Sequence, residues 1–146
     1  MRLVLDTNIV MDMLHFNNPH TRELQLALES GRLRCFTDRD ALAELQRVTT
    51  YPEFKLESEA QQTLQDRYLS FAVVCDAEGE ENYLLPRCRD TDDQKFLILA
   101  VRCRADLLLT RDKLLLRLNR HRHIAPPCPI LTAEDAHQRL FPTASP

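Results

Sequence analysis

The chain has 146 residues, 44% of them hydrophobic and 28% charged, which fits a single globular domain over residues 1–146 and leaves no room for a second. The formal net charge of −3 gives no overall attraction to a polyanion, so a nucleic acid would have to be held by a local basic surface or by bound cations. The five cysteines are scattered and form no Cys-x-x-Cys pair. The sequence shows no signal-peptide core and no apolar run near the ~18 residues of a membrane span. We therefore expect a cytoplasmic protein.

The first half of the chain alternates short apolar runs with helical patterns. Residues 3–5 form a strand-like run closed by Asp6, and apolar residues at helical spacing follow over 9–14. A helical segment after Pro19 ends at Gly31, and residues 33–37 indicate a second strand. Thr37 or Asp38 can cap the next helix, whose apolar stripe ends before Pro52 and consists of Ala41, Leu42, Leu45 and Val48.

The second half repeats the alternation. We expect a helix over 57–70 with Ala60, Leu64 and Tyr68 on one side, a strand over 71–75 and a loop over 76–82. Asp92 can cap a further helix with Phe96, Leu97, Ala100 and Val101 on its buried side. An apolar strand over 106–110, a short helix from Asp112, a proline-rich link and a final strand and helix over 130–140 follow. This order predicts an α/β fold of three layers, with a central parallel sheet covered on both faces by helices.

Four acidic residues stand where such a sheet would gather them. Asp6 and Asp112 directly follow predicted strands, and Glu44 and Asp93 lie in the first turns of helices at the same edge. Carboxylates held together without a cation repel one another by up to ~4 kcal/mol per pair at ~4 Å and an effective dielectric of ~20. Hard oxygen ligands favour Mg²⁺ or Mn²⁺ over zinc, so the pattern indicates a divalent-metal site.

Each acid also has an ordinary structural interpretation. Asp6 could form an Asx turn with Asn8, and Glu44 could be a solvated helix residue. Asp93 competes with Asp90 and Asp92 for the role of helix cap, and Asp112 could stabilise a helix N-terminus through the helix dipole. Only the combination of the four is specific.

The combination resembles a known family. The segments Leu3-Val4-Leu5-Asp6-Thr7-Asn8, Ala41-Leu42-Ala43-Glu44-Leu45, Asp90-Thr91-Asp92-Asp93-Gln94-Lys95-Phe96-Leu97 and Leu109-Thr110-Arg111-Asp112 are similar, in order and over essentially the whole chain, to PIN-domain (PilT N-terminus-like) nucleases, whose fold is 5′-nuclease-like. Within that family the toxins of prokaryotic toxin–antitoxin pairs are the most similar. No core acidic position of the family pattern is missing.

The resemblance assigns roles to individual residues. It implies that Asp6, Glu44, Asp93 and Asp112 are the catalytic and metal-binding acids. Asn8 and Thr110 would support them, and Asp90 and Asp92 would be outer-shell acids. Asp93 is favoured over Asp92 because it stands seven residues before Ala100, the interval that the family shows between its acid and a small helix residue, and Asp92 then fits as the helix cap.

The implied chemistry is Mg²⁺- or Mn²⁺-assisted hydrolysis of RNA by activated water, without a covalent nucleophile on the protein. The resemblance also implies a cognate antitoxin that covers the acidic site and self-association into a dimer or larger homo-oligomer, with no membrane partner. A phosphoryl-transfer domain of the receiver or haloacid-dehalogenase type also places an Asp after its first strand. The haloacid-dehalogenase type, however, needs a second Asp where this chain has Asn8, and the receiver type gives no role to Glu44. A catalytically inactive PIN-like module that binds RNA or protein remains the alternative.

The densest basic run spans residues 111–123 and surrounds the last predicted acid, Asp112. It contains Arg111, Lys113, Arg117, Arg120 and Arg122, with His121 and His123. Such a run suits contacts with phosphates beside an acidic centre, and a solvated helix face is the equally simple alternative.

Overall fold

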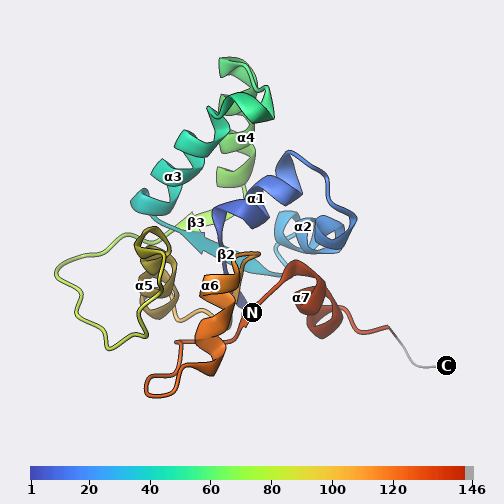
Figure 1. Ribbon diagram of the computed structural model, residues 1–146. Coiled ribbons are helices and arrows are strands. Elements are labelled where there is room, and N and C mark those ends of the chain that lie inside the picture. Colours follow the sequence, from blue (N-terminus) through green and yellow to red (C-terminus); the bar gives the residue numbers. More distant parts are fainter. Residues whose placement is uncertain (144–146) are drawn as a thin grey trace.

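The computed structural model describes residues 1–143 and contains a five-stranded sheet in the order β3-β2-β1-β4-β5 (Figure 1). Every neighbouring pair of strands is parallel. The strands are β1 (Arg2–Leu5), β2 (Arg34–Thr37), β3 (Ala72–Val74), β4 (Leu107–Leu109) and β5 (Ile130–Leu131). The predicted α/β fold with a central parallel sheet is therefore confirmed. The predicted domain extends to residue 146, and its last three residues lie outside the described part of the chain.

Helices connect the strands and cover both faces of the sheet (Figure 1). The α-helices are α1 (Thr7–Leu14), α2 (Arg22–Glu29), α3 (Arg39–Thr49), α4 (Ser58–Leu69), α5 (Gln94–Arg102), α6 (Lys113–Leu116) and α7 (Ala133–Leu140). Short 3₁₀ turns are η1 (Pro19–Thr21), η2 (Pro52–Phe54), η3 (Thr91–Asp93) and η4 (Arg117–Arg120).

Side chains alternate between the two faces of each strand, which divides the core into two parts. Leu3 and Leu5 of β1 pack in one part, with apolar residues of α1, α2, α4 and α7. Val4, between them, packs in the other part with residues of α5 and α6. The near-continuous apolar runs of β1 and β4 follow from this burial on both faces.

Helix boundaries mostly follow the predicted signals. Gly31 adopts a φ of +79°, a conformation that few side chains tolerate, and it ends the α2 segment as expected. Asp38 rather than Thr37 caps α3, because its side chain accepts a hydrogen bond from the Ala41 N–H at 2.8 Å. Thr132 accepts one from the Asp135 N–H at 3.2 Å and caps α7.

The segment before α5 differs from prediction. Asp92 does not cap it: the side chain of Asp90 accepts a hydrogen bond from the Asp92 N–H at 3.1 Å, and the chain enters α5 through the 3₁₀ turn η3. The prediction that Asp92 is the cap is therefore wrong, because the aspartate two residues earlier satisfies the first free N–H. Ala60 of α4 and Val101 of α5 also lie less buried than expected, at exposed and half-buried positions.

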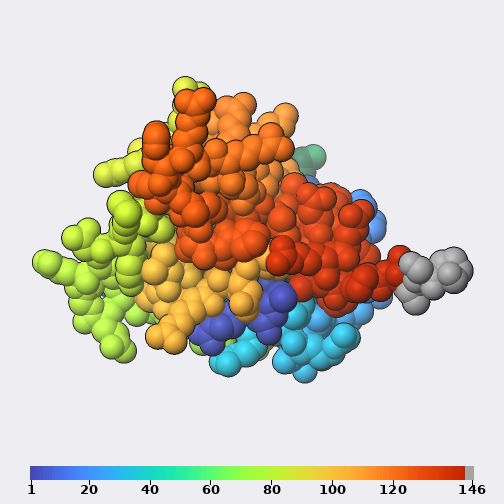
Figure 2. Space-filling view, turned by 90° about the horizontal axis from the view of Figure 1, so that it is seen from below, coloured from blue at the N-terminus to red at the C-terminus, as the bar shows by residue number. Residues whose placement is uncertain are grey.

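The irregular loop is longer than predicted and spans residues 75–90. Arg102 holds it, donating hydrogen bonds to Glu81 at 2.6 and 2.8 Å, to Asp38 at 2.9 Å and to the Cys75 carbonyl at 2.7 Å. In the view from below, this loop and the segment around α6 and η4 stand out from the body of the molecule (Figure 2).

The two central strands end side by side. The N–H of Asp6 donates a hydrogen bond to the Leu109 carbonyl at 2.9 Å, so the residues that follow β1 and β4 start from the same point of the sheet edge. This edge is where parallel α/β sheets bind ligands. In the described part of the chain, no helix has the length and apolar character needed to cross a membrane.

Candidate metal centre

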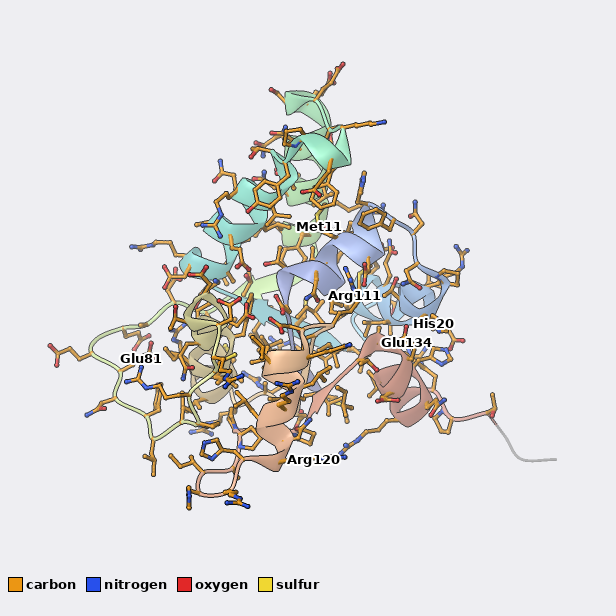
Figure 3. All side chains as sticks on the ribbon, in the orientation of Figure 1. Met11, His20, Glu81, Arg111, Arg120 and Glu134 are labelled. Atoms are coloured by element: carbon orange, nitrogen blue, oxygen red, sulfur yellow. The ribbon has the colours of Figure 1, made fainter. Side chains whose placement is uncertain are left out.

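A pocket of about 320 Å³ opens at the carboxyl ends of β1 and β4. The predicted acidic quartet of Asp6, Glu44, Asp93 and Asp112 lines it, together with Asp90 and Asn8. Arg111 and Met11, labelled in Figure 3, belong to the same lining; Met11 is part of α1, and Arg111 comes just before α6. The fold thus brings five carboxylates from four separate segments of the chain to one place.

Three of these acids are the closest together. Asp90, Asp93 and Asp112 each offer a carboxylate oxygen, and the three oxygens lie within 4.8 Å of one another. The family resemblance implies only a supporting position for Asp90, yet it stands beside the two predicted ligands because the η3 turn folds it back toward Asp93. Asp92, its predicted companion, is exposed and is not part of the pocket lining.

Asp6 lies on the floor of the pocket, with 4% of its surface exposed. Its Oδ2 accepts hydrogen bonds from the Thr110 hydroxyl at 2.6 Å and from the Asn8 amide at 3.3 Å, so both predicted supporting residues contact it. Burial raises the pKa of Asp6 to about 6 although the Thr110 hydrogen bond lowers it, and the charges of Glu44 and Asp112 raise it further. The site therefore resists full ionisation.

Asp93 and Asp112 share a hydrogen bond between their side chains. Burial raises the pKa of Asp93 to about 8, with further contributions from this hydrogen bond and from the neighbouring carboxylates. The same hydrogen bond lowers the pKa of Asp112. Asp112 also caps α6 through the Leu114 N–H at 2.8 Å, which fixes its position.

Glu44 is engaged by neighbours on both sides. The Thr7 hydroxyl donates to its Oε2, and the Lys95 ammonium donates to its Oε1 at 3.0 Å. Lys95 also donates to the Asp92 carbonyl, which ties α3 to the start of α5. Lys95 has no predicted role in the sequence pattern, because its partner lies 51 residues away and nothing local indicates the pair.

The predicted basic residues divide between two places. Arg111 lines the acidic pocket, and its Nε donates to the buried Asp12 carboxylate at 2.7 Å. Lys113, Arg117 and Arg120 line a separate hollow of about 380 Å³ along α6 and η4. Arg120 lies at the far end of this segment from Arg111 (Figure 3), and Arg122 is exposed in the loop beyond it.

The chemistry of the pocket suits a hard cation. Its carboxylates and the side-chain oxygens of Thr7 and Asn8 are the donors that Mg²⁺ and Mn²⁺ accept, and such ions take only one or two carboxylates directly. Burial raises the pKa values of Asp6 and Asp93, and repulsion from the neighbouring carboxylates raises them further. A bound cation would displace the proton from Asp93 and relieve this repulsion.

Comparison with known proteins agrees with the geometry. A family model described as PIN domain matches residues 2–114. Among solved structures, the fold resembles a chain of VapBC2 from Rickettsia felis, determined bound to a DNA fragment from the promoter. The TM-score is 0.59 and the identity 18%, over 90% of this chain and 98% of that one. No curated protein sequence matches the chain.

Proposed function

This chain belongs to the PIN domain family, and from that premise we propose that it is a divalent-metal-dependent endoribonuclease. The observation that carries the proposal is the oxygen cluster of Asp90, Asp93 and Asp112 above the buried Asp6, in one pocket at the sheet edge. Fold resemblance alone would not carry it, since related folds serve many functions.

We assign metal binding to Asp6, Asp93 and Asp112, with Asp90 beside them. Glu44 is a catalytic acid of the same pocket and acts through water, because Thr7 and Lys95 already occupy its two oxygens. When bound, Mg²⁺ or Mn²⁺ supplies a Lewis acid that makes water a nucleophile and stabilises charge on the phosphate. Thr110 and Asn8 keep Asp6 oriented through their hydrogen bonds.

The basic residues would hold the RNA backbone. Arg111 lies closest to the acids and contacts the phosphate next to the cleaved bond, while its pairing with Asp12 fixes its direction. The hollow lined by Lys113, Arg117 and Arg120 receives phosphates further along the strand, and Arg122 extends this path. Binding that depends on such contacts weakens steeply as salt concentration rises.

A toxin role with a protein partner extends the proposal. The Rickettsia felis structure is that of VapBC2 on promoter DNA, and the fold of this chain resembles a chain of that assembly. We therefore propose a cognate antitoxin that covers the acidic pocket, a homo-oligomeric state and a cytoplasmic location. Coexpression with the product of a neighbouring gene, followed by gel filtration with light scattering, tests the first two.

The decisive experiment is cleavage of a labelled RNA pool with Mn²⁺, Mg²⁺ or a chelator. We expect cleavage with either metal, none with the chelator, and a loss of at least about 100-fold in Asp6→Asn and Asp93→Asn. Asp66→Asn is the matched control, because Asp66 is an aspartate of α4 outside the pocket. Equal cleavage by Asp6→Asn and the wild type would disprove the assignment. RNA binding without cleavage under every metal condition would identify a noncatalytic binding module instead.

A further inference from the structure

Four aromatic rings meet at the rim of the acidic pocket. The ring centroids of His15 and Phe16 are 4.6 Å apart, those of Phe16 and Phe54 5.8 Å, and those of His15 and Phe54 5.6 Å, all edge to face. Tyr51 stacks on Phe54 at 6.3 Å with an interplanar angle of 14°. We call these four residues the aromatic ridge. It joins the end of α1 to the η2 turn between α3 and α4, three helices that lie together above the sheet (Figure 1).

The aromatic ridge separates two hollows. Phe16 and Phe54 line the acidic pocket, where Met11 and Val48 continue the apolar wall toward the carboxylates. On the other side, His15 lines a hollow of about 600 Å³ over α4, together with the charged residues Lys55, Glu57, Glu59 and Arg67. A ligand that leaves the acidic pocket on this side must therefore pass over the aromatic rings.

Two of the four rings are unusually exposed for their type, whereas His15 and Phe54 are half-buried. Phe16 is 52% exposed and Tyr51 37%, although the chain has only six phenylalanines and three tyrosines with which to build its core. The conformation is also fixed locally, since Lys55 adopts a φ of +53° directly after η2 and so turns the chain just beyond Phe54. The fold thus holds large apolar rings in solvent beside its charged site.

Positive charge accompanies the rings. Arg47 lies beside the Tyr51 side chain, and its guanidinium is 3.9 Å from the Glu44 carboxylate, so it stands between the aromatic ridge and the pocket. Lys55 is exposed at the end of η2. Flat rings with flanking cations fit a strand that carries both bases and phosphates. Glu57 and Glu59 beyond the ridge oppose a longer phosphate path, which limits the contact to the bases nearest the pocket.

We propose that the aromatic ridge is a stacking platform for unpaired bases next to the cleaved phosphate. This inference rests on the proposed nuclease function and assigns it a base-contacting subsite in this chain. A base in a duplex cannot present its face to Phe16, whereas an unpaired base can stack on it whatever its identity. The platform therefore selects for strandedness and not for sequence.

The test is a binding assay that does not depend on cleavage. Fluorescence anisotropy of a short fluorescein-labelled single-stranded RNA, and of the same sequence as a duplex, is measured in an Asp93→Asn background that prevents cutting. Phe16→Leu keeps the apolar surface and removes the ring, and we expect it to weaken single-strand binding about tenfold while leaving duplex binding unchanged. Phe16→Trp should retain or improve single-strand binding. Tyr83→Leu is the matched control, since Tyr83 is an exposed aromatic in the 75–90 loop.

An RNA with abasic sites beside the cleavage position isolates the stacking contact. With protein that keeps Phe16, the abasic RNA should bind less tightly than the intact strand. With Phe16→Leu, the two RNAs should bind with equal affinity. Unchanged single-strand affinity in Phe16→Leu overturns the proposal and makes the aromatic ridge a surface for a protein partner. If the ring dependence appears but wild-type protein cleaves nothing with Mn²⁺, the platform stands and the nuclease function fails. If the wild-type protein cleaves RNA without any dependence on Phe16, the nuclease function stands and the platform fails.

Discussion

Lys95 and Glu44 form an ion pair at 3.0 Å that joins α5 to α3 beside the acidic pocket. Both side chains are largely buried, with 19% and 12% of their surfaces exposed. The pair places one positive charge next to five carboxylates. Glu44 is the one predicted metal ligand that is not an aspartate, and Lys95 binds its carboxylate.

Replacing Lys95 with Met should tighten Mn²⁺ binding. Removing the ammonium frees Glu44 and removes a charge that repels the cation, and we expect a gain of about 3- to 10-fold, measured by isothermal titration calorimetry. Arg47→Met is the control, because Arg47 lies 3.9 Å from the same carboxylate but is 60% exposed, where charge effects are screened. Weaker Mn²⁺ binding in Lys95→Met would mean that the ammonium orients Glu44 for direct ligation.

Thr110→Val should destabilise both the fold and the site. The buried hydroxyl donates to Asp6 at 2.6 Å and accepts from the Asp112 N–H at 2.9 Å, and valine leaves both partners without it. We expect a loss of about 1–3 kcal/mol in urea unfolding and weaker Mn²⁺ binding. Thr110→Ser keeps the hydroxyl and should restore the metal affinity. A Val variant as stable as the wild type would contradict the role given to this hydroxyl.

The metal-free protein should lose stability as the pH rises. The pKa of Asp93 is about 8 in the folded state against an ordinary 3.8, so between these values the folded state binds a proton that the unfolded state has released. Stability therefore falls as the pH rises from about 4 through about 8, and Asp6 contributes in the same direction up to about 6. In thermal melts with a chelator, Asp93→Asn should match the wild type near pH 4 and exceed its Tm near pH 8 by a few degrees. Parallel pH curves for the two proteins would refute the assignment.

Metal binding should release protons near neutral pH. A cation needs the ionised form of Asp93, whose pKa of about 8 means that most molecules carry the proton at pH 7. The apparent enthalpy of Mn²⁺ binding should then differ between buffers of different ionisation enthalpy, with about one proton released per site. The rise in Tm on adding Mn²⁺ should also be larger at pH 8 than at pH 6. A buffer-independent enthalpy would indicate that Asp93 does not take part.

Arg102→Met should loosen the 75–90 loop without changing the acidic pocket. Arg102 bridges Glu81 and Asp38 and is 14% exposed, so its removal leaves two carboxylates without their cation. We expect a loss of about 2 kcal/mol, below the cost of breaking a fully buried pair, and faster proteolysis between residues 76 and 90. Arg67→Met, which removes an exposed pair with Glu29, should change neither quantity. Mn²⁺ affinity should remain at the wild-type value in both variants.

The sequence predicts the centre of the sheet well because β1 and β4 are buried on both faces. Residues 3–5 and 106–110 are apolar runs too short for helices. Their predicted boundaries lie within two residues of the ends of β1 and β4. Gly31 and Asp38 mark helix ends through local chemistry that acts on their own backbone. The convergence of Asp6 and Asp112 follows from parallel strand order alone.

The remaining differences depend on contacts that no local pattern encodes. Three aspartates in four residues can each cap the next helix, and the choice of Asp90 depends on how the 75–90 loop returns to α5. The path of this loop into α5 also brings Asp90 beside Asp93 and Asp112. Lys95 meets Glu44, and Arg102 meets Asp38 and Glu81, across wide sequence separations that apolar periodicity does not report.

The pairing of β1 with β4 also dictates when the pocket can exist. Asp6 is made first and occupies the centre of the sheet, but the Leu109 carbonyl and the Thr110 hydroxyl that hold it belong to residues synthesised about a hundred positions later. A chain still emerging from the ribosome has no adjacent strand on that side of β1 and lacks Asp112 altogether. If the proposed nuclease function holds, the acidic centre would stay unassembled beside the ribosomal RNA until nearly the whole domain has been translated.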